Sequence, residues 1–100
     1  RIAGVELGPH QIRVNSISPG AIATPIFYGG SQRANDLTDE ENERKMKKLK
    51  GNLANAVPLK RSGLASDIAE AALYLSSDAG SFVTCQDIVV DGGRTAMFNE

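Results

Sequence analysis

Apolar side chains along this 100-residue chain follow a helical spacing in some segments and a strand-like spacing in others. Ile2 and Val5 share one helix face ahead of a Gly-Pro pair that stops helices, so a helix is predicted over residues 1–8. Residues 12–18 are rich in β-branched side chains, and their positions alternate between two faces as in a strand. The segment ends at a Pro-Gly pair. This pattern predicts a strand followed by a tight turn.

The middle of the chain combines a loop with a well-marked helix. Residues 20–36 contain glycines and small side chains without sustained periodicity, which predicts a loop with one helical turn after Thr24. Further on, Thr38 and Glu41 form a capping-box pattern ahead of a charged stretch that runs to a glycine. A helix is therefore predicted over residues 39–50, with too few apolar positions to be buried.

Charge is unevenly distributed along this predicted helix. Acidic side chains lead and basic ones trail, the latter being Arg44, Lys45, Lys47, Lys48 and Lys50. The helix dipole and solvation explain this order, because cations are favourable near a helix C-terminus. A phosphate-binding role for the basic side chains is disfavoured, since acidic residues lie within a turn or two of them.

The last third of the chain predicts one more helix and one more strand. Ile68, Ala72 and Leu75 share a helix face, which predicts a helix over residues 65–77. Residues 86–91 form a short run with an apolar centre, typical of a strand covered on both faces. Helix, strand, loop, helix, helix and strand in that order indicate a parallel α/β sheet, and two strands alone would be only marginally stable.

Composition narrows the class of protein. With 41% hydrophobic and 23% charged residues, the chain is typical of a packed globular domain. A net charge of −1 leaves no basic excess for phosphate contacts, so nucleic-acid binding is not expected. No apolar run approaches the length that spans a bilayer, and the first residues lack an initiator Met and a signal-peptide pattern. We therefore expect a cytoplasmic protein, no membrane partner, and a chain that starts within a longer sequence.

Cysteine and histidine offer little chemistry. Cys85 is the only cysteine and His10 the only histidine, which excludes an internal disulfide and argues against a zinc site. A Cys-His catalytic pair remains formally open. The simpler interpretation of Cys85 as a small, half-buried apolar side chain is favoured, and no metal site is predicted.

Three segments of the chain match a known family in sequence. Residues 13–25 read RVNSISPGAIATP, residues 61–69 contain a spaced R-x-G and D-I-A, and residues 90–93 read VDGG. In this order they resemble the C-terminal half of the short-chain dehydrogenase/reductase family. The resemblance implies an α/β fold, a Rossmann-like doubly wound parallel sheet, of which this chain supplies the last two strands with their covering helices. Residues 1–100 would form a C-terminal fragment of one such domain, with residues 25–57 as its substrate-binding loop region.

The resemblance also implies an oxidoreductase activity, the transfer of hydride between NAD or NADP and a small alcohol or ketone. The family's glycine-rich turn, its catalytic Ser and its Y-x-x-x-K pair have no match in this chain. Tyr28 and Tyr74 are followed four positions later by Gln32 and Asp78 instead of Lys. No catalytic residue is assigned, so the chain alone is not expected to catalyse, and these residues do not specify the choice between NAD and NADP.

The resemblance places site residues in two groups. The implied cofactor-binding residues are Pro19, Gly20, Ile22 and Thr24, with the Ile22 backbone at the nicotinamide carboxamide and the Thr24 hydroxyl nearby. Pro fixes φ and Gly lets the backbone approach a planar ring, although an ordinary strand-to-loop turn would use the same pair. The implied substrate-binding residues are Ile26, Phe27 and Tyr28, which could equally serve local packing.

Other positions are predicted to be structural. Asn15 is expected to bond neighbouring backbone, and Asp91 to mark a turn near a subunit contact. Gln11 and Cys85 stand where the family often has glycine, so a left-handed backbone there would be strained. Ala65 replaces a usual Pro at the start of the last helix, which weakens that start unless the following serine provides the cap.

Two other functions remain open on the sequence alone. The paired helices and the last strand could form a non-catalytic oligomerisation or interaction module, and a homo-oligomer is expected in either case. A small helical nucleic-acid binder is opposed by the charge balance. A Y-x-x-x-K pair and a glycine-rich turn elsewhere in the same protein would decide for the enzyme.

Overall fold

The computed structural model describes residues 2–98 of the chain, which form two compact units. The elements in chain order are α1 (Ile2–Leu7), η1 (Gly8–His10), β1 (Ser16–Pro19), η2 (Pro25–Tyr28), α2 (Gly30–Asn35), α3 (Asp39–Asn55), α4 (Ala65–Ser76), η3 (Asp78–Gly80), β2 (Asp87–Val90) and η4 (Thr95–Phe98), where η marks a 3₁₀ turn. The first unit comprises residues 2–19 and 66–90, and the second comprises residues 20–65 and 91–98. The chain therefore passes into the second unit at the carboxyl ends of both strands.

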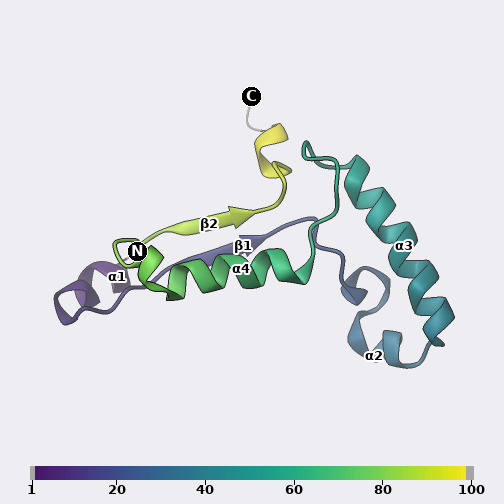
Figure 1. The fold of residues 1–100 in the computed structure, drawn as a ribbon, viewed down its shortest axis with the longest axis horizontal. Helices are drawn as coiled ribbons and strands as arrows, with labels where there is room; N and C mark the ends of the chain where they lie inside the picture. Colours follow the sequence, from purple (N-terminus) through teal and green to yellow (C-terminus); the bar gives the residue numbers. More distant parts are fainter. Residues whose placement is uncertain (1, 99–100) are drawn as a thin grey trace. The chain divides into compact units, whose positions relative to one another are not determined.

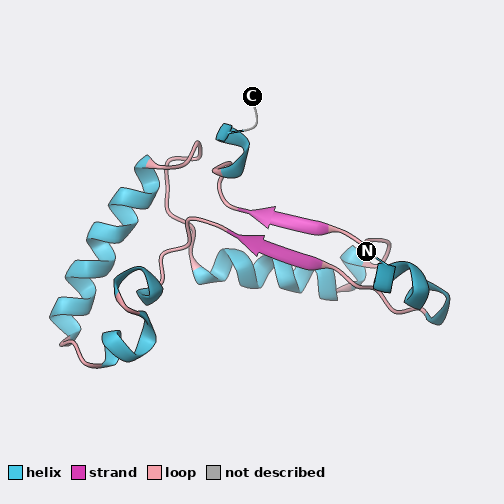
Figure 2. Cartoon of the chain, turned by 180° about the vertical axis from the view of Figure 1, so that it is seen from behind, coloured by secondary structure: helices cyan, strands magenta, loops and turns pink. Residues whose placement is uncertain are grey.

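The first unit is built on two parallel strands. β1 pairs with β2 in a register that runs from Ser16 opposite Asp87 to Pro19 opposite Val90. Helix α4 runs alongside the two strands (Figure 1), as the view from behind also shows (Figure 2). The parallel α/β arrangement predicted from the sequence is confirmed, and α4 ends within one residue of its predicted end. Both strands end at the same edge of the sheet.

The predicted start of the first strand is wrong, because β1 begins at Ser16 and not at residue 12. Ahead of it, one backbone bond from the Cys85 amide to the Val14 carbonyl (2.8 Å) is joined by side-chain bonds. The Val14 amide donates to Thr84 Oγ1 (3.1 Å), and Asn15 Nδ2 donates to the Val83 carbonyl (2.9 Å). Asn15 Oδ1 in turn accepts from the Gln86 amide at 3.1 Å. Such side-chain bonds compete with strand pairing, so the extended segment holds its neighbour without forming a regular strand there. They also confirm the structural role predicted for Asn15.

Two non-glycine residues of the first unit adopt the left-handed backbone that the sequence comparison anticipated. Gln11 and Cys85 both have φ of 62°. Gln11 ends η1, and its amide donates to the Gly8 carbonyl at 2.9 Å. Each left-handed residue of this kind costs about 1–2 kcal/mol relative to glycine. The Cys85 side chain lies against Gly4, where an added Cβ would collide with its Sγ atom, so α1 can approach only because position 4 is glycine.

The second unit contains the longest helix, and its sequence-based boundary needs correction. α3 begins after Thr38 as predicted, but it continues through Gly51 to Asn55. The basic side chains therefore lie in the middle of the helix, and the last turn contains none. The helix dipole does not explain their position, so that part of the sequence interpretation is wrong. Solvation remains as the explanation for these basic side chains, because Lys47 and Lys48 are exposed.

The segment between the first strand and α3 is more ordered than the predicted loop. η2 is the single turn expected after Thr24, whereas the short helix α2 was not predicted. Gly29 lies between them with φ of 110°, and Gly30 is the first residue of α2 with φ of 86°. Backbone of this kind suits glycine, so the pair explains why the two helical turns stay distinct.

The apolar core of each unit is small. Val57 (1% exposed) and Ala23 are buried in the second unit, and Leu75 is the buried apolar side chain of α4. Leu73 of α4 and Val89 of β2 are exposed. The burial pattern of β2 alternates, so within residues 2–98 this strand lacks the cover on both faces that its sequence predicted.

Candidate functional site

The segment that follows β1 starts with a glycine in a tight space. Pro19 is the last residue of β1, and Gly20 comes next. A Cβ at Gly20 would lie 2.9 Å from the Cβ of Asp91, closer than real side chains approach. Glycine is therefore needed at position 20 for the chain to pass Asp91. This is a structural reason for the Pro-Gly pair, and it operates whether or not a cofactor binds.

Ile22 forms a short parallel bridge with Gly63, within the second unit. The Gly63 amide donates to the Ala21 carbonyl, and the Gly63 carbonyl accepts from the Ala23 amide, both at 2.9 Å. In a parallel bridge of this kind, the residue between the two bonded neighbours directs its own N–H and C=O to the opposite edge. Neither group of Ile22 forms a hydrogen bond within the described residues. The bridge therefore presents one backbone donor and one acceptor side by side.

Gly63 is closely surrounded in this bridge. A side chain at position 63 would collide with the Ile22 side chain and come within 3.3 Å of the Ala21 carbonyl. Ala21 itself has a left-handed backbone, with φ of 54°. In the sequence, Gly63 is visible only as part of the R-x-G match and has no predicted role, because its partner lies far along the chain. The structure brings it to the centre of the candidate site.

Thr24 follows two residues later, with an extended backbone of φ −137° and ψ 160°. It precedes the η2 turn, whose Phe27 amide donates to the Thr24 carbonyl at 3.3 Å. The Thr24 hydroxyl forms no capping bond with η2. The side chain is half-buried, and it follows the Ile22 edge two residues along the chain.

The three predicted substrate-binding residues do not share one environment. Ile26 and Phe27 are 74% and 54% exposed, so their apolar surfaces remain available for contact. Tyr28 is half-buried, and Lys45 Nζ of α3 lies 5.9 Å from the centre of its ring. This distance is within the range of a cation–π interaction. Tyr28 therefore packs toward α3, and the other two form the exposed part of the segment.

Asp91 closes a turn in the second unit. Its Oδ1 accepts from the Gly93 amide (2.9 Å) and its Oδ2 from the Thr95 amide (2.8 Å). Hydrogen bonds from the Thr95 side chain and from these two amides hold the pKa of the Asp91 carboxyl below its ordinary value. The turn predicted at this position is confirmed. Its carboxylate is engaged in the turn.

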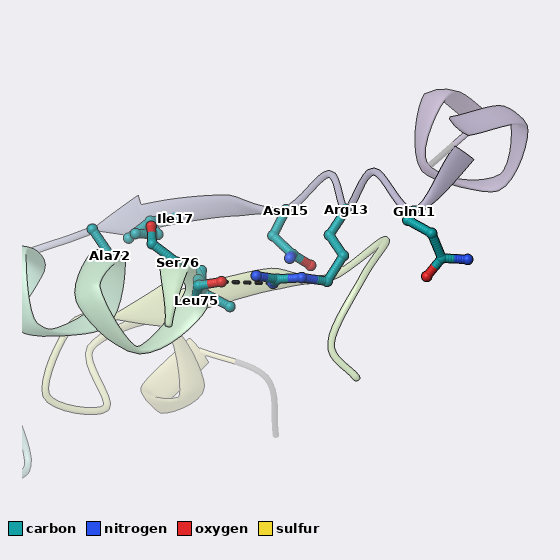
Figure 3. Close-up of a pocket in the computed structure, with 7 residues that line it drawn as sticks. All are labelled: Gln11, Arg13, Asn15, Ile17, Ala72, Leu75 and Ser76. Atoms are coloured by element: carbon teal, nitrogen blue, oxygen red, sulfur yellow. Dashed lines mark hydrogen bonds between the residues drawn. The ribbon is translucent and has the colours of Figure 1, made fainter. Parts of the chain in front are cut away.

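Arg13, the first residue of the matched segment, has a structural role. Its Nη1 donates to the Leu75 carbonyl at 2.6 Å in the last turn of α4, as Figure 3 shows, and to the Val83 carbonyl at 3.3 Å. A cation at this end of a helix bonds carbonyls that lack partners within the helix. An open cavity of about 500 Å³ lies beside this contact, lined by Gln11, Arg13, Asn15, Ile17, Ala72, Leu75 and Ser76. It contains none of the predicted site residues.

The described side chains include no group of three or more His, Cys, Asp or Glu that could hold a metal ion. None of the described helices combines the length and the apolar character needed to cross a membrane.

Comparison with known proteins agrees with these observations. The family described as enoyl-(acyl carrier protein) reductase matches residues 1–95. Momilactone A synthase of Oryza sativa subsp. japonica is 44% identical over 97 residues, which are 95% of this chain and 31% of that protein. NADPH-dependent reductase BacG of Bacillus subtilis (strain 168) is 35% identical over 89 residues, which are 89% of this chain and 33% of that protein.

Solved structures of the same fold also match. YwfH, an NADPH-dependent reductase involved in bacilysin biosynthesis, superposes with a TM-score of 0.66 and 33% identity over 93% of this chain and 34% of its own. A short-chain dehydrogenase family protein from Francisella tularensis gives a TM-score of 0.67 at 29% identity, over 95% of this chain and 38% of its own. The chain belongs to the short-chain dehydrogenase/reductase family, and it is homologous to NAD(P)-dependent oxidoreductases. It spans about a third of the length of the curated relatives that it matches.

Proposed function

We propose that this chain is part of an NAD(P)-dependent oxidoreductase that transfers hydride between the nicotinamide and a small alcohol or ketone. In this proposal, the chain contributes the turn at the nicotinamide, formed by Pro19, Gly20, Ile22 and Thr24, and the substrate-binding region 25–57. The observation that carries it is the free backbone edge of Ile22, which Gly63 holds in place.

The chemistry of the nicotinamide carboxamide fits this edge. A carboxamide has an NH₂ donor and a carbonyl acceptor side by side. The Ile22 backbone offers the complementary acceptor and donor, and the uncapped Thr24 hydroxyl can add a further bond. The cofactor supplies the hydride when bound, and the residues of this chain orient the ring. None of them is proposed to transfer the proton.

Substrate contact is proposed for the exposed apolar pair Ile26 and Phe27. Ligand pockets are mostly lined by apolar and aromatic side chains, and these two lie just after the proposed nicotinamide turn. Similarity to reductases of small molecules favours a small carbonyl or hydroxyl substrate. Levodione reductase of Leifsonia aquatica, for example, is 36% identical over 98 residues.

Replacement of Thr24 tests the assignment of the turn. In the full-length protein, Thr24→Val removes the hydroxyl at nearly constant size, and loss of one neutral hydrogen bond should raise the Kd for NAD(P)H about twofold to tenfold. Thr24→Ser keeps the hydroxyl and should bind close to the parent. The Kd is measured from the fluorescence of NADH and NADPH in separate titrations, which also shows which cofactor the protein prefers. Equal affinities of the Val variant and the parent for NAD(P)H would remove the main residue-level support for assigning this turn to the cofactor.

A homo-oligomer is proposed as well. Leu73 is 62% exposed on α4, and Val89 is exposed on β2 in the same unit. Large exposed apolar side chains of this kind favour contact with another surface, and in the full-length protein that surface is the rest of the domain or a second copy. Sedimentation of the full-length protein and of a Leu73→Glu variant should give a larger species for the parent than for the variant. A monomeric parent would exclude the oligomer.

A further inference from the structure

Asn42 connects α3 to the end of α2. Its Nδ2 donates to the Ala34 carbonyl at 2.7 Å, and the bond is partly buried. A carbonyl can only accept, so the amide must face Ala34 with its nitrogen, and this fixes the orientation of the whole group. Asn42 Oδ1 is then buried without a hydrogen-bond partner among the described residues. The buried Oδ1 atom costs free energy because it has no partner, and the Nδ2 bond to Ala34 offsets this cost.

Lys45 connects the same helix to η2. It lies three positions after Asn42, on the same side of α3, and its Nζ is 5.9 Å from the centre of the Tyr28 ring. Tyr28 is the last residue of η2, and Ala34 is near the end of α2. Two independent contacts from one helix therefore hold the two short helical turns on either side of the Gly29-Gly30 pair.

The glycine pair makes such contacts necessary. Gly29 and Gly30 both have positive φ, and glycine has the widest conformational freedom of any residue. One local bond, from the Gly29 amide to the Pro25 carbonyl, closes η2 at the start of this pair. Asn42 and Lys45 add two contacts from α3, outside the segment.

We propose that Asn42 and Lys45 are positioning residues for the substrate, which fix the geometry of residues 25–35 so that Ile26 and Phe27 keep a defined exposed surface. The inference rests on the proposed function, because it assumes that this segment contacts the substrate. Neither residue touches the substrate itself. Both act through the backbone at Ala34 and the ring of Tyr28.

Steady-state kinetics of the full-length protein test the proposal, with NAD(P)H and a panel of small ketones that includes levodione. Asn42→Ala and Lys45→Met should each raise the KM for the ketone reduced best by about twofold to tenfold, with kcat and the Kd for NAD(P)H unchanged. Lys45→Arg keeps the cation and should restore the parent KM. Asn52→Ala and Lys48→Met change the same residue types at exposed positions of α3 and should have no effect.

Hydrogen exchange gives a readout that does not depend on turnover. Peptides covering residues 26–35 should exchange faster in Asn42→Ala and Lys45→Met than in the parent, while peptides of α4 should not change. An unchanged KM in both variants, or equal changes in the two control variants, would overturn the proposal. The proposal is also overturned if kcat and the affinity for NAD(P)H fall as the KM rises, because that combination indicates a general loss of structure.

Phe27→Ala distinguishes a failure of the substrate segment from a failure of the positioning role. If this variant leaves the KM of every ketone unchanged, the assignment of the substrate segment fails, and the positioning role fails with it. If Phe27→Ala raises the KM while Asn42→Ala and Lys45→Met do not, the substrate segment stands and only the positioning role is overturned.

Discussion

The thiol of Cys85 occupies the space that a side chain at Gly4 would need. The two residues come from distant parts of the sequence, and each is unusual in its own element. Gly4 is buried inside a helix, where glycine is unfavourable, and Cys85 has a left-handed backbone, where glycine is preferred. The structure thus carries a glycine where the helix favours alanine and a cysteine where the backbone favours glycine.

A double-mutant cycle follows from this contact. Gly4→Ala should destabilise the full-length protein by about 1–3 kcal/mol, because the added methyl overpacks against Sγ. In a Cys85→Gly background, the same change should be neutral or stabilising by up to about 1 kcal/mol, since alanine is the better helix former. Urea titration measures the four unfolding free energies. Gly8→Ala meets no neighbouring atoms and serves as the control. Equal costs of Gly4→Ala in both backgrounds would contradict the contact.

Gly63→Ala should affect both stability and cofactor binding. The methyl displaces the Ile22 side chain and crowds the Ala21 carbonyl, so a loss of about 1–3 kcal/mol is expected. Because the Ile22 edge moves with it, the Kd for NAD(P)H should rise as well. Gly51→Ala is the matched control, since that glycine lies in α3 with no atom within 4 Å of an added Cβ. This control should stabilise the helix by about 1 kcal/mol. If Gly63→Ala binds NAD(P)H as tightly as the parent, the bridge does not contribute to cofactor binding.

The start of α3 depends on a reciprocal pair of side-chain bonds. Thr38 Oγ1 accepts from the Glu41 amide at 3.1 Å, and Glu41 Oε1 accepts from the Thr38 amide at 3.3 Å. Thr38→Ala should lower the free energy of unfolding by about 0.5–2 kcal/mol. Thr38→Ser keeps the acceptor and should lose much less. Denaturant titrations of both variants measure the difference, and an equal loss in the two would show that the cap contributes little.

The Asp91 turn predicts a dependence of stability on pH. The pKa of Asp91 is lowered in the fold by hydrogen bonds from Thr95 and Gly93, so the ionised form favours the folded state. This stabilisation is complete above the ordinary pKa of the carboxyl and is lost as the pH falls through the lower, folded value. Asp91→Asn should therefore make stability less sensitive to acid below about pH 4.

Glu41 limits how much of the acid sensitivity Asp91→Asn can remove. Its pKa is also lowered, first by the hydrogen bond from the Thr38 backbone, so it adds to the same acid limb and remains in the Asp91→Asn variant. Denaturant titrations at neutral and acid pH compare the parent, Asp91→Asn and the exposed-site control Glu70→Gln. An acid loss in Asp91→Asn as large as in the parent would contradict the role of this turn.

For α3, a local capping signal predicted the start correctly, and a local glycine signal predicted the end wrongly. The Thr38 cap lies within four residues of its partner Glu41, so the pattern is visible in sequence and the structure confirms it. Gly51 was expected to end α3, but a glycine inside a helix costs only about 1 kcal/mol, which the remaining turns compensate. α2 was missed because it has no capping side chain and only six residues.

Long-range pairing accounts for what the sequence did not show at the candidate site. The Ile22 edge exists because Gly63 bonds to the residues on either side of it, and no periodicity connects these two positions. The family match contained both residues but gave only Ile22 a role. The difference among Ile26, Phe27 and Tyr28 likewise depends on Lys45, which lies in another helix.

The matched segment of residues 13–25 has two halves that differ in what their polar groups do. Arg13 and Asn15 direct their side-chain donors at the carbonyls of Leu75 and Val83, so the first half holds the end of α4 and the approach to β2. The backbone N–H and C=O of Ile22 form no hydrogen bond within the described residues, and the Thr24 hydroxyl forms no capping bond. Variants in this one stretch should therefore fall into two separable phenotypes. Changes in the first half alter how much folded protein accumulates, and changes in the second half alter what the folded protein binds.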